Sequence, residues 1–504
     1  MYTKINAATL IGLECEQTTV EVDISGTWPG FQIIGLTDVA IQEAKERIKT
    51  AWKNSGYIFP NNARIVINLA PADSKKGGSS YDVPMAIGMY LSLNKIDSTP
   101  LETNVYIGEL ALDGSVRHVN GVLPLTIFAK EQGYKEIFVP ETNAQEANII
   151  PEITVYPIKT FKQLVEHITG INHILPKEKT AYTRKKPTYH LDMADIKGQE
   201  SAKRALEIVA SGGHNILLSG PPGSGKTLLS RTLPSILPPM STQECIEVTK
   251  IYSASGLLPP NTDLITTRPF RSPHHTSSTA SIIGGGRTPK PGEISLAHRG
   301  IFSADEFPEF PKQIIESLRQ PLEDKIITVS RVQGTATFPA NIMLVASMNP
   351  CPCGFASDPS KQCTCSPQHV ERYNKKLSGP ILDRIDLYVE VPKIPFEKLN
   401  ETITTETSKT MRNKVSAARQ KQQKRFTNST TVCNSEMTNK ENTAHCQLDD
   451  GTKQLLKQAV SQLNISPRSY FRIIKVGRTI ADLADSEHIH QEHIAEALQY
   501  RKKE

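Results

Sequence analysis

The sequence of 504 residues contains no long apolar run. No segment approaches the roughly 20 consecutive apolar residues that a membrane-spanning helix needs. The first residues, MYTKINAATLIGLECEQ, have neither a long apolar stretch nor the small-residue cleavage site of a signal peptide. We therefore expect a cytoplasmic protein that makes no use of a membrane. Sequence repeats of fixed period are also absent, which argues against a repeat architecture.

Charge of one sign is not in large excess. The formal net charge is +6, and this mild basicity permits binding to a polyanion without demanding it. A hydrophobic content of 38% and a charged content of 22% are ordinary for a globular protein. The chain is too long for a single hydrophobic core and long enough for two or three domains.

Cysteine is scarce, with eight residues in the chain. Four of them, Cys351, Cys353, Cys363 and Cys365, lie close together in sequence. In a reducing compartment such a cluster indicates metal binding rather than disulfides, and four thiolates can supply one tetrahedral Zn²⁺ site. Free thiols are the alternative, because C-x-C pairs are a less usual zinc pattern than C-x₂-C. We reject the histidine pair 274–275 as a metal site, since neighbours on a strand point in opposite directions.

The pattern of apolar residues predicts two α/β domains, a linker and a helical domain. The predicted boundaries are 1–168 for the first α/β domain, 169–191 for a basic linker, 192–395 for the second α/β domain and 396–504 for the helical domain. In the first domain, strand-like runs at 63–70 and 136–139 alternate with a helical pattern at 38–56. In the helical domain, the Thr-, Asn- and Ser-rich segment 427–448 is predicted to be a loose loop.

A phosphate-binding loop follows the apolar strand predicted at 215–220. The pattern G-x-x-x-x-G-K-[ST] is matched by Gly220, Pro221, Pro222, Gly223, Ser224, Gly225, Lys226 and Thr227. Its glycines let the backbone curl so that N–H groups point at phosphate oxygens. Lys226 is expected to contact the β- and γ-phosphates of ATP, and the Thr227 hydroxyl is expected to ligate Mg²⁺.

Two further polar strand ends complete the predicted nucleotide site. An apolar strand ends in Asp305 and Glu306, which suits Asp305 to holding Mg²⁺ and Glu306 to polarising the attacking water. Taken alone, such a pair is usually a solvated turn. A second buried-type strand, 341–350, ends at Asn349, whose amide can orient the hydrolytic water or sense the γ-phosphate.

With these three pieces in order, the chain resembles the ComM/YifB family over nearly its whole length. This family is the magnesium-chelatase-like branch of AAA+ ATPases, with an N-terminal Lon-protease-like domain. The strings that carry the resemblance are RPFRSPHHTSSTASIIGGG (268–286), PGEISLAHRGIFSADEFPEF (291–310), MNPCPCG (348–354), SGPILDRIDLYVEVP (378–392), RTIADL (478–483) and EALQYR (496–501). The resemblance implies an α/β fold: a P-loop AAA+ core with a parallel sheet and flanking helices, a C-terminal helical lid, and an N-terminal α/β domain of the Lon-protease (S5-like) type.

The resemblance also implies the roles of particular residues. Arg384 matches an arginine finger that reaches the γ-phosphate bound by the next subunit, a group that can contribute about 10³–10⁵ in rate. A surface salt bridge to Asp383 or Asp386 is the alternative reading of Arg384. Asn349 matches the first sensor, and Arg468 matches the second sensor in the helical lid.

A finger that acts on a neighbouring subunit requires an oligomer, and the family implies a homohexamer. The implied function is that of an ATP-driven ring motor on single-stranded or branched DNA, a branch-migration helicase in recombination and natural transformation. The alternative is an ATPase subunit of a magnesium-chelatase-like complex. The loop near 284–286, with Arg268, Arg271 and Arg287, is expected to be mobile and cationic, and related motors use such a loop and a second hairpin, here near 330–339, to grip nucleic acid. A packed surface insertion is the alternative reading of either loop.

The first domain resembles a Lon-protease domain that lacks its catalytic pair. Ser79 and Ser80 lie near the expected nucleophile, but the position of the lysine base falls near Leu123. A serine without a base is a poor nucleophile, so we predict no protease activity. We expect Lys75 and Lys76 to face a polyanion instead.

Overall fold

The computed structural model describes most of the chain and divides it into two compact units. The described residues are 2–26, 28–35, 37–72, 76–179, 187–259, 262–286, 289–331, 334–358, 361–394, 406–427, 429–463 and 465–501. Unit 1 comprises Met1–Lys185 and Thr242–Ile265, and unit 2 comprises Lys186–Ser241 and Thr266–Glu504. The finer boundaries predicted from the sequence stay predictions.

Unit 1 is an α/β unit with two main sheets. A four-stranded sheet has the order β1-β2-β4-β3, and a three-stranded parallel sheet has the order β5-β8-β9. The strands are β1 (Tyr2–Ile11), β2 (Glu14–Ser25), β3 (Gly30–Ile34), β4 (Arg64–Ala70), β5 (Asn104–Tyr106), β8 (Glu136–Pro140) and β9 (Thr154–Ile158), with a short hairpin of β6 (Glu109–Leu110) and β7 (Val116–Arg117). The helices are α1 (Val39–Asn54), α2 (Asp82–Asn94), α3 (Val122–Glu131), α4 (Ala144–Asn148), α5 (Phe161–Ile168) and α8 (Thr242–Ser255).

Local sequence explains the main elements of unit 1. Strand β4 alternates buried and less buried residues, as expected of a strand with one face on the core. Helix α1 begins where the Asp38 side chain accepts a hydrogen bond from the Ile41 N–H, which satisfies an otherwise unpaired donor. The strands predicted at 63–70 and 136–139 and the helix predicted at 38–56 are therefore confirmed within one or two residues.

Helix α8 belongs to unit 1 although the chain reaches it from the phosphate-binding loop. The N–H of Gly121, at the start of α3, donates to the carbonyl of Ser253 in α8 at 3.0 Å. Gly256, just after α8, lies so close to Asn120 that a Cβ there would be 2.7 Å from its Nδ2 atom. No sequence pattern indicates this assignment, because it depends on a long-range contact.

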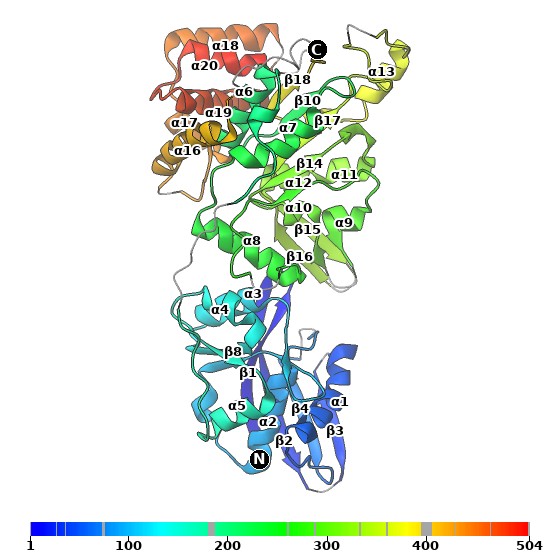
Figure 1. Cartoon of the computed structure of the whole chain (residues 1–504), viewed down its shortest axis with the longest axis vertical. Helices are drawn as coiled ribbons and strands as arrows, with labels where there is room; N and C mark the ends of the chain where they lie inside the picture. Colours follow the sequence, from blue (N-terminus) through cyan, green and yellow to red (C-terminus); the bar gives the residue numbers. More distant parts are fainter. Residues whose placement is uncertain are drawn as a thin grey trace. The chain divides into compact units, whose positions relative to one another are not determined.

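Unit 2 contains a five-stranded parallel sheet of order β11-β14-β17-β10-β18 (Figure 1). Its strands are β11 (Phe270–Arg271), β14 (Ile301–Ala304), β17 (Met343–Met348), β10 (Ile216–Ser219) and β18 (Leu387–Glu390). All four residues of β14 and the first five of β17 are buried, as expected of strands covered on both faces. The predicted α/β fold with a parallel sheet is confirmed.

Helices and hairpins surround this sheet. The helices of this part are α6 (Glu200–Gly212), α7 (Lys226–Thr232), α9 (Thr279–Ile283), α10 (Glu293–Leu296), α11 (Lys312–Ser317), α12 (Arg319–Asp324), α13 (Pro367–Asn374) and α14 (Gly379–Leu382). Two hairpins are formed by β12 (Gly284–Gly285) with β13 (Lys290–Pro291) and by β15 (Ile326–Arg331) with β16 (Gly334–Pro339).

The C-terminal part of unit 2 is helical, as predicted, and appears in orange to red in Figure 1. Its helices are α16 (Ser408–Arg425), α17 (Asn439–His445), α18 (Asp450–Gln462), α19 (Pro467–Leu483) and α20 (Gln491–Gln499). The prediction of a loose loop at 427–448 is wrong, because the segment contains α17 and the 3-10 turn η6 (Asn434–Glu436). Thr438 and Glu441 form a capping box at the start of α17, which fixes this helix despite its polar composition.

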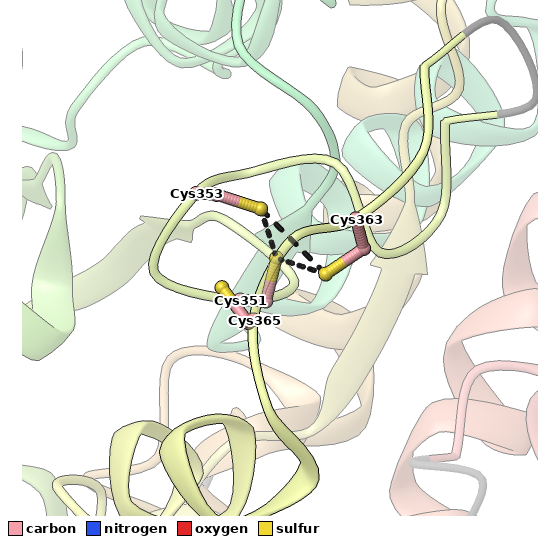
Figure 2. Close-up of side chains that lie close together, drawn as sticks. All are labelled: Cys351, Cys353, Cys363 and Cys365. Atoms are coloured by element: carbon pink, nitrogen blue, oxygen red, sulfur yellow. Dashed lines mark hydrogen bonds between the residues drawn. The ribbon is translucent and has the colours of Figure 1, made fainter.

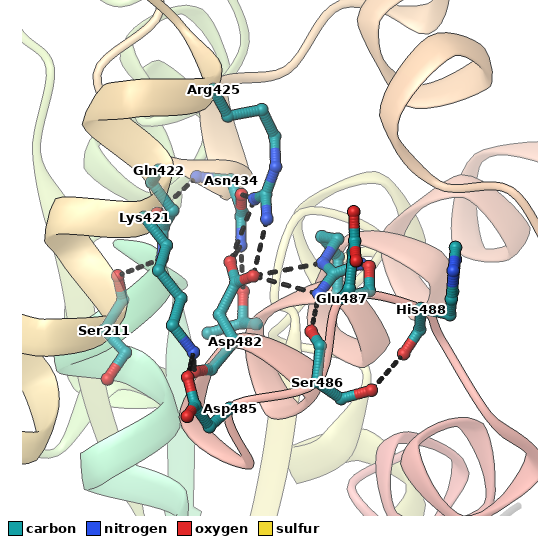
Figure 3. Close-up of polar contacts among 12 residues, drawn as sticks. Ser211, Lys421, Gln422, Arg425, Asn434, Asp482, Asp485, Ser486, Glu487 and His488 are labelled. Atoms are coloured by element: carbon teal, nitrogen blue, oxygen red, sulfur yellow. Dashed lines mark hydrogen bonds and ion pairs between the residues drawn. The ribbon is translucent and has the colours of Figure 1, made fainter.

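A buried ionic network ties the segment 427–448 to the helices around it (Figure 3). Asp482, which is 2% exposed, accepts hydrogen bonds from Arg425 at 2.6 Å, from Arg478 at 3.1 Å and from the Asn434 amide at 2.9 Å. Two guanidinium groups and one amide thus satisfy a single buried carboxylate, a condition under which burying charge is tolerated.

Among the described residues, none of the helices combines the length and the apolar composition that crossing a bilayer requires.

Candidate functional site

Three predicted site elements meet at the carboxyl edge of the five-stranded sheet. The phosphate-binding loop follows β10, Asp305 and Glu306 follow β14, and Asn349 follows β17. These strands are parallel neighbours in the sheet, so their carboxyl ends lie side by side. The structure therefore brings together the residues that the sequence predicted for one nucleotide site.

The backbone of the phosphate-binding loop depends on its glycines. A Cβ on Gly220 would lie 2.1 Å from the carbonyl oxygen of Val391, so no side chain fits there. Gly223 and Gly225 have φ values of +75° and +93°, in the left-handed region that glycine adopts without strain. The loop is thus curled as anion binding by peptide N–H groups requires.

Lys226 is held by the loop and by the sensor strand. Its Nζ atom donates to the carbonyls of Gly220 at 2.7 Å and Pro221 at 2.9 Å, and to Asn349 Oδ1 at 3.3 Å. Burial lowers the pKa of Lys226, against the opposing effect of Asp305 and Glu306. The ammonium is therefore poorly solvated, which strengthens its attraction for phosphate.

Asp305 joins the loop to two neighbouring strands. Its Oδ2 atom accepts from the Thr227 hydroxyl at 2.8 Å, and its Oδ1 atom accepts a short hydrogen bond from the Ser347 hydroxyl in β17. A carboxylate next to a hydroxyl is a suitable ligand pair for Mg²⁺, which prefers oxygen. Thr227 and Asp305 could therefore hold Mg²⁺ together, while Ser347 orients the carboxylate.

Glu306 has a partner that the sequence did not suggest. Its backbone is left-handed, with φ +52°, and its Oε2 atom lies 3.3 Å from Nδ1 of His275. The rings of His274 and His275 lie 4.2 Å apart, centroid to centroid, in a turn rather than on a strand. The stated reason for rejecting this pair as a metal site is therefore wrong. Pro273, which favours a turn, was the signal that could have corrected it.

Arg384 lies at the opposite, amino edge of the same sheet. It precedes β18, which runs parallel to β10, and its carbonyl accepts from the side chain of Asn215, the residue before β10. Four strand residues separate Asn215 from the phosphate-binding loop, a distance of about 13 Å. Arg384 therefore lies away from the loop of its own chain. Its Nε atom is 3.2 Å from Glu323 Oε2, so its ion pair is with Glu323 rather than with either predicted aspartate.

Arg468 shares this amino edge. It forms an ion pair with the same Glu323 and lines a cavity of about 800 Å³. The cavity is also lined by Asn215, Arg299, Asn341, Arg472 and Lys475. Asn215 lies one residue before β10, and Arg299 and Asn341 lie two residues before β14 and β17, which places the cavity at the amino ends of the strands. The two predicted arginines thus converge on one carboxylate, and both lie across the sheet from the P-loop.

A buried aspartate holds the amino edge in place. Asp386 accepts from Arg472 at 2.9 Å and from the N–H of Asn215 at 2.8 Å, and it lies 3.7 Å from His214. Although burial opposes it, the charge of Arg472 and the N–H of Asn215 hold the pKa of Asp386 well below its usual value. The ion pair between Arg472 of α19 and Asp386, the residue before β18, therefore holds the helix α19 against the sheet.

The four clustered cysteines come together beyond β17 (Figure 2). All four sulfur atoms lie within 4.8 Å of one another, with Cys351 3.4 Å from Cys353 and 3.6 Å from Cys363. Zinc bound to four thiolates at about 2.3 Å requires sulfur atoms about 3.8 Å apart. The N–H groups of Phe355 and Thr364 lower the pKa of the Cys353 thiol. The donor set and its spacing fit one Zn²⁺ ion.

Several predicted cationic residues are engaged within the chain. Arg268 donates to the carbonyls of Pro238 and Arg299, and Arg271 pairs with Glu293 at 2.8 Å. Arg287 and Lys75 lie outside the described residues. The prediction that Lys76 faces a polyanion is wrong, because Lys76 is fully buried and donates to the Pro71 carbonyl.

The residues of the predicted inactive protease site are also engaged. Ser79 donates a short hydrogen bond to the Glu109 carboxylate, the Ser80 carbonyl accepts from the N–H of Gly108, and Leu123 is fully buried in α3. The predicted absence of protease activity stays a prediction.

Comparisons with known families agree with the geometry of unit 2. Residues 192–399 match the family model described as magnesium chelatase, subunit ChlI, and residues 405–501 match the model of the ChlI C-terminal region. Residues 20–143 match the model described as subunit ChlI of Mg-chelatase.

Curated relatives cover nearly the whole chain. The competence protein ComM of Haemophilus influenzae is 40% identical over 498 residues, which are 97% of this chain and 96% of that protein. The Escherichia coli protein YifB is 38% identical over 502 residues, which are 99% of this chain and 96% of that protein. Lon protease 2 of Bacillus subtilis is 30% identical over 125 residues, which are 24% of this chain and 22% of that protein.

Proposed function

This chain belongs to the ComM/YifB family of magnesium-chelatase-like AAA+ ATPases, and on this premise we propose that it is an ATP-driven ring motor that acts on DNA. The proposed substrate is single-stranded or branched DNA, and the proposed activity is branch migration by a helicase in recombination and natural transformation. The proposed assembly is a homohexamer working in the cytoplasm.

The observation that carries the proposal is the division of the catalytic groups between two edges of one sheet. The P-loop and the Asp305–Glu306 pair lie at the carboxyl edge, while Arg384 and Arg468 lie at the amino edge. A complete site therefore needs the carboxyl edge of one copy and the amino edge of another. Such a head-to-tail interface closes into a ring when its rotation divides a full turn.

Each residue has a distinct role in hydrolysis. When ATP and Mg²⁺ are bound, they supply the scissile phosphate and the cation that neutralises its charge. Lys226 attracts the terminal phosphates, while Thr227 and Asp305 supply oxygen ligands to the cation. Glu306 accepts a proton from the attacking water, and Asn349, already bonded to Lys226, orients that water. Arg384 of a neighbouring copy stabilises the developing charge.

Action on DNA is supported by the surface hairpins and by the family. Hairpins β12–β13 and β15–β16 lie next to each other, with Arg331 of β15 3.5 Å from the Gly284 carbonyl in β12. Lys290 of β13 is exposed, as is Arg331. Basic hairpins bind phosphates without sequence preference, and the net charge of +6 favours this. One relative is named a competence protein.

The test is the rate of ATP hydrolysis with and without DNA at a stated salt concentration. We expect forked or single-stranded DNA to raise the rate severalfold, and the stimulation to weaken as salt rises. The Lys226→Ala variant controls for contaminating ATPases and should show no rate under either condition. A rate that no DNA changes, together with stimulated insertion of Mg²⁺ into a porphyrin by partner proteins, would favour a chelatase-like subunit instead.

We also propose that the four clustered cysteines bind a structural zinc ion. Four thiolates fill the coordination sphere of Zn²⁺, so a catalytic role for this metal is not proposed.

A further inference from the structure

The cysteine cluster begins where the sensor strand ends. Asn349 follows β17 directly, and Cys351, which is fully buried, comes two residues later. The side chain of Asn349 accepts from Lys226 at 3.3 Å. The first cysteine is therefore separated by a single residue from a side chain that contacts the phosphate-binding lysine.

The tight turn of this cluster presses against the phosphate-binding loop. The N–H of Gly354 donates to the carbonyl of Cys351 at 3.0 Å, and Gly354 has φ +86°. A Cβ added to Gly354 would lie 2.6 Å from Cδ and 2.7 Å from Cγ of Pro222, and 3.8 Å from Cγ of Asn349. The turn thus contacts both the phosphate-binding loop and the sensor residue, with no room for a larger side chain.

The far end of the cluster is tied to the same site. After Cys365 the chain enters α13, where burial raises the pKa of the Tyr373 hydroxyl and the nearby Asn349 backbone opposes that rise. Just beyond α13, Lys376 pairs with Glu309 at 2.9 Å, in the turn that follows Asp305 and Glu306. Both ends of the cysteine segment are therefore anchored to the nucleotide site, and the thiolates close the segment on itself.

We propose that one Zn²⁺ ion held by the four cysteines makes this segment a rigid strut that sets the position of the phosphate-binding loop. The strut acts through Gly354, which packs on Pro222 and Asn349. Zinc occupancy then determines how tightly the chain binds adenine nucleotide, without any contact between the metal and the nucleotide. This inference rests on the proposed ATPase function, and it adds a metal-dependent control of that site.

The first experiment measures zinc content and nucleotide affinity on the full chain. We expect one zinc per chain by elemental analysis, and loss of that zinc in the Cys363→Ser/Cys365→Ser double variant. We expect the Kd for fluorescent ADP with Mg²⁺ to rise about tenfold in that variant. Four freely reactive thiols and no zinc in the unchanged chain would overturn the metal site. A zinc-free double variant that binds ADP as the unchanged chain does would overturn the control of affinity.

A second variant tests the strut without touching the metal ligands. Gly354→Ala should keep one zinc per chain but weaken ADP binding, because the new methyl group displaces Pro222. Gly133→Ala is the matched control, since Gly133 has φ +81° and nothing within 4 Å of an added Cβ. Both variants carry the same backbone strain, but only the first should change the Kd for ADP. Equal ADP affinity in the two variants would overturn the strut.

These outcomes are separable from failure of the proposed function. If the unchanged chain binds no adenine nucleotide, the ATPase assignment itself fails. If the unchanged chain binds nucleotide, but the cysteine double variant and Gly354→Ala bind ADP as tightly as Gly133→Ala does, the ATPase assignment stands and the proposed strut is wrong.

Discussion

The two edges of the five-stranded sheet differ in what their charged groups do. At the carboxyl edge, Asp305 and Glu306 are partly or fully exposed, and they bond to hydroxyls and to a histidine that water can reach. At the amino edge, Asp386 is buried and fully satisfied by Arg472 and the Asn215 backbone. The carboxylates of one edge are available to a ligand, and the carboxylate of the other edge holds the fold together.

Two arginines of the amino edge, Arg384 and Arg468, bond neither to hydroxyls and a histidine, like the carboxylates of the carboxyl edge, nor to a buried carboxylate, like Arg472. Arg384 and Arg468 converge on Glu323, a carboxylate whose side chain is 45% exposed. An exposed ion pair is worth at most about 1 kcal/mol, so the pair of Arg468 with Glu323, whose side chains are 35% and 45% exposed, can be released at little cost. Arg384 is held more firmly, because its side chain is 14% exposed and also donates to the Pro380 carbonyl at 2.7 Å. The comparison teaches that ligand-accessible carboxylates lie at one edge of the sheet, while two arginines that share one exposed carboxylate lie at the other.

The largest effect is expected from Arg384→Ala. Hydrolysis should fall by about 10³–10⁵-fold, because the guanidinium that stabilises the transition state in trans is lost, while ATP binding remains. The measurement is steady-state ATPase activity beside nucleotide binding. Mixing this variant with Lys226→Ala should restore part of the activity, since a mixed pair contains one complete site. Failure of the mixture to regain any activity would break the two-edge comparison.

Glu306→Gln should lower turnover by about 10²–10⁴-fold, the contribution of a positioned general base. Nucleotide binding should persist, because Lys226, Thr227 and Asp305 are unchanged. Single-turnover hydrolysis with equilibrium binding checks both statements. Normal turnover by this variant would mean that another group activates the water.

Asp386→Ala should reduce the free energy of unfolding of unit 2 by about 3–5 kcal/mol, because it leaves the partly buried Arg472 without its carboxylate and the Asn215 N–H without its acceptor. The matched change at the other edge, Asp305→Asn, should cost less than about 1 kcal/mol while abolishing activity. Urea unfolding of both variants gives the comparison. Because the pKa of Asp386 is lowered in the folded chain, its contribution is complete above about pH 4 and declines as the pH falls below that value.

His275→Ala should raise the ATPase rate measured without DNA by up to about fivefold. The imidazole lies 3.3 Å from Glu306, and an exposed pair of this kind is worth up to about 1 kcal/mol, which must be lost before Glu306 can turn to the attacking water. His274→Ala is the control, because the His274 ring bonds to the Thr276 hydroxyl at 2.7 Å. A lower rate in His275→Ala would show that the histidine positions Glu306 for catalysis.

The smallest effect is expected from Glu323→Gln, which removes the negative charge that Arg384 and Arg468 share. We expect a rise of about twofold in the ATPase rate of the assembled protein, because the ion pairs no longer compete with a neighbour's phosphate. ATPase assays at two protein concentrations separate this effect from a change in assembly. A fall in the rate would mean that Glu323 aligns the arginines rather than restraining them.

The predictable part of the site consists of residues that are consecutive in sequence. Lys226 and Thr227 lie in one loop, and Asp305 and Glu306 end one strand. The spacing of the loop motif and the apolar strand before each pair were therefore enough to predict these two parts of the site. The capping box of Thr438 and Glu441 was equally local, and it could have corrected the predicted loop at 427–448.

The partners that were missed are distant in sequence. Ser347 bonds to Asp305 from another strand, and His275 approaches Glu306 from a turn. Glu323, which lies in α12, pairs with two arginines from other elements. Neither spacing nor composition reports such pairs, because they arise only when strands and helices pack. Burial of Lys76 was missed for the same reason, since a lysine in a polar stretch is normally solvated.

The sequence by itself determined which residue types are available for the nucleotide site and that each follows an apolar strand, because a phosphate cradle needs particular residues at fixed spacings. Only the tertiary structure decided that the arginines lie across the sheet from that cradle, that α8 packs with the N-terminal unit, and that Gly354 contacts Pro222. Parallel strand pairing sends the two ends of each strand to opposite edges, and that geometry exists only once the sheet has formed.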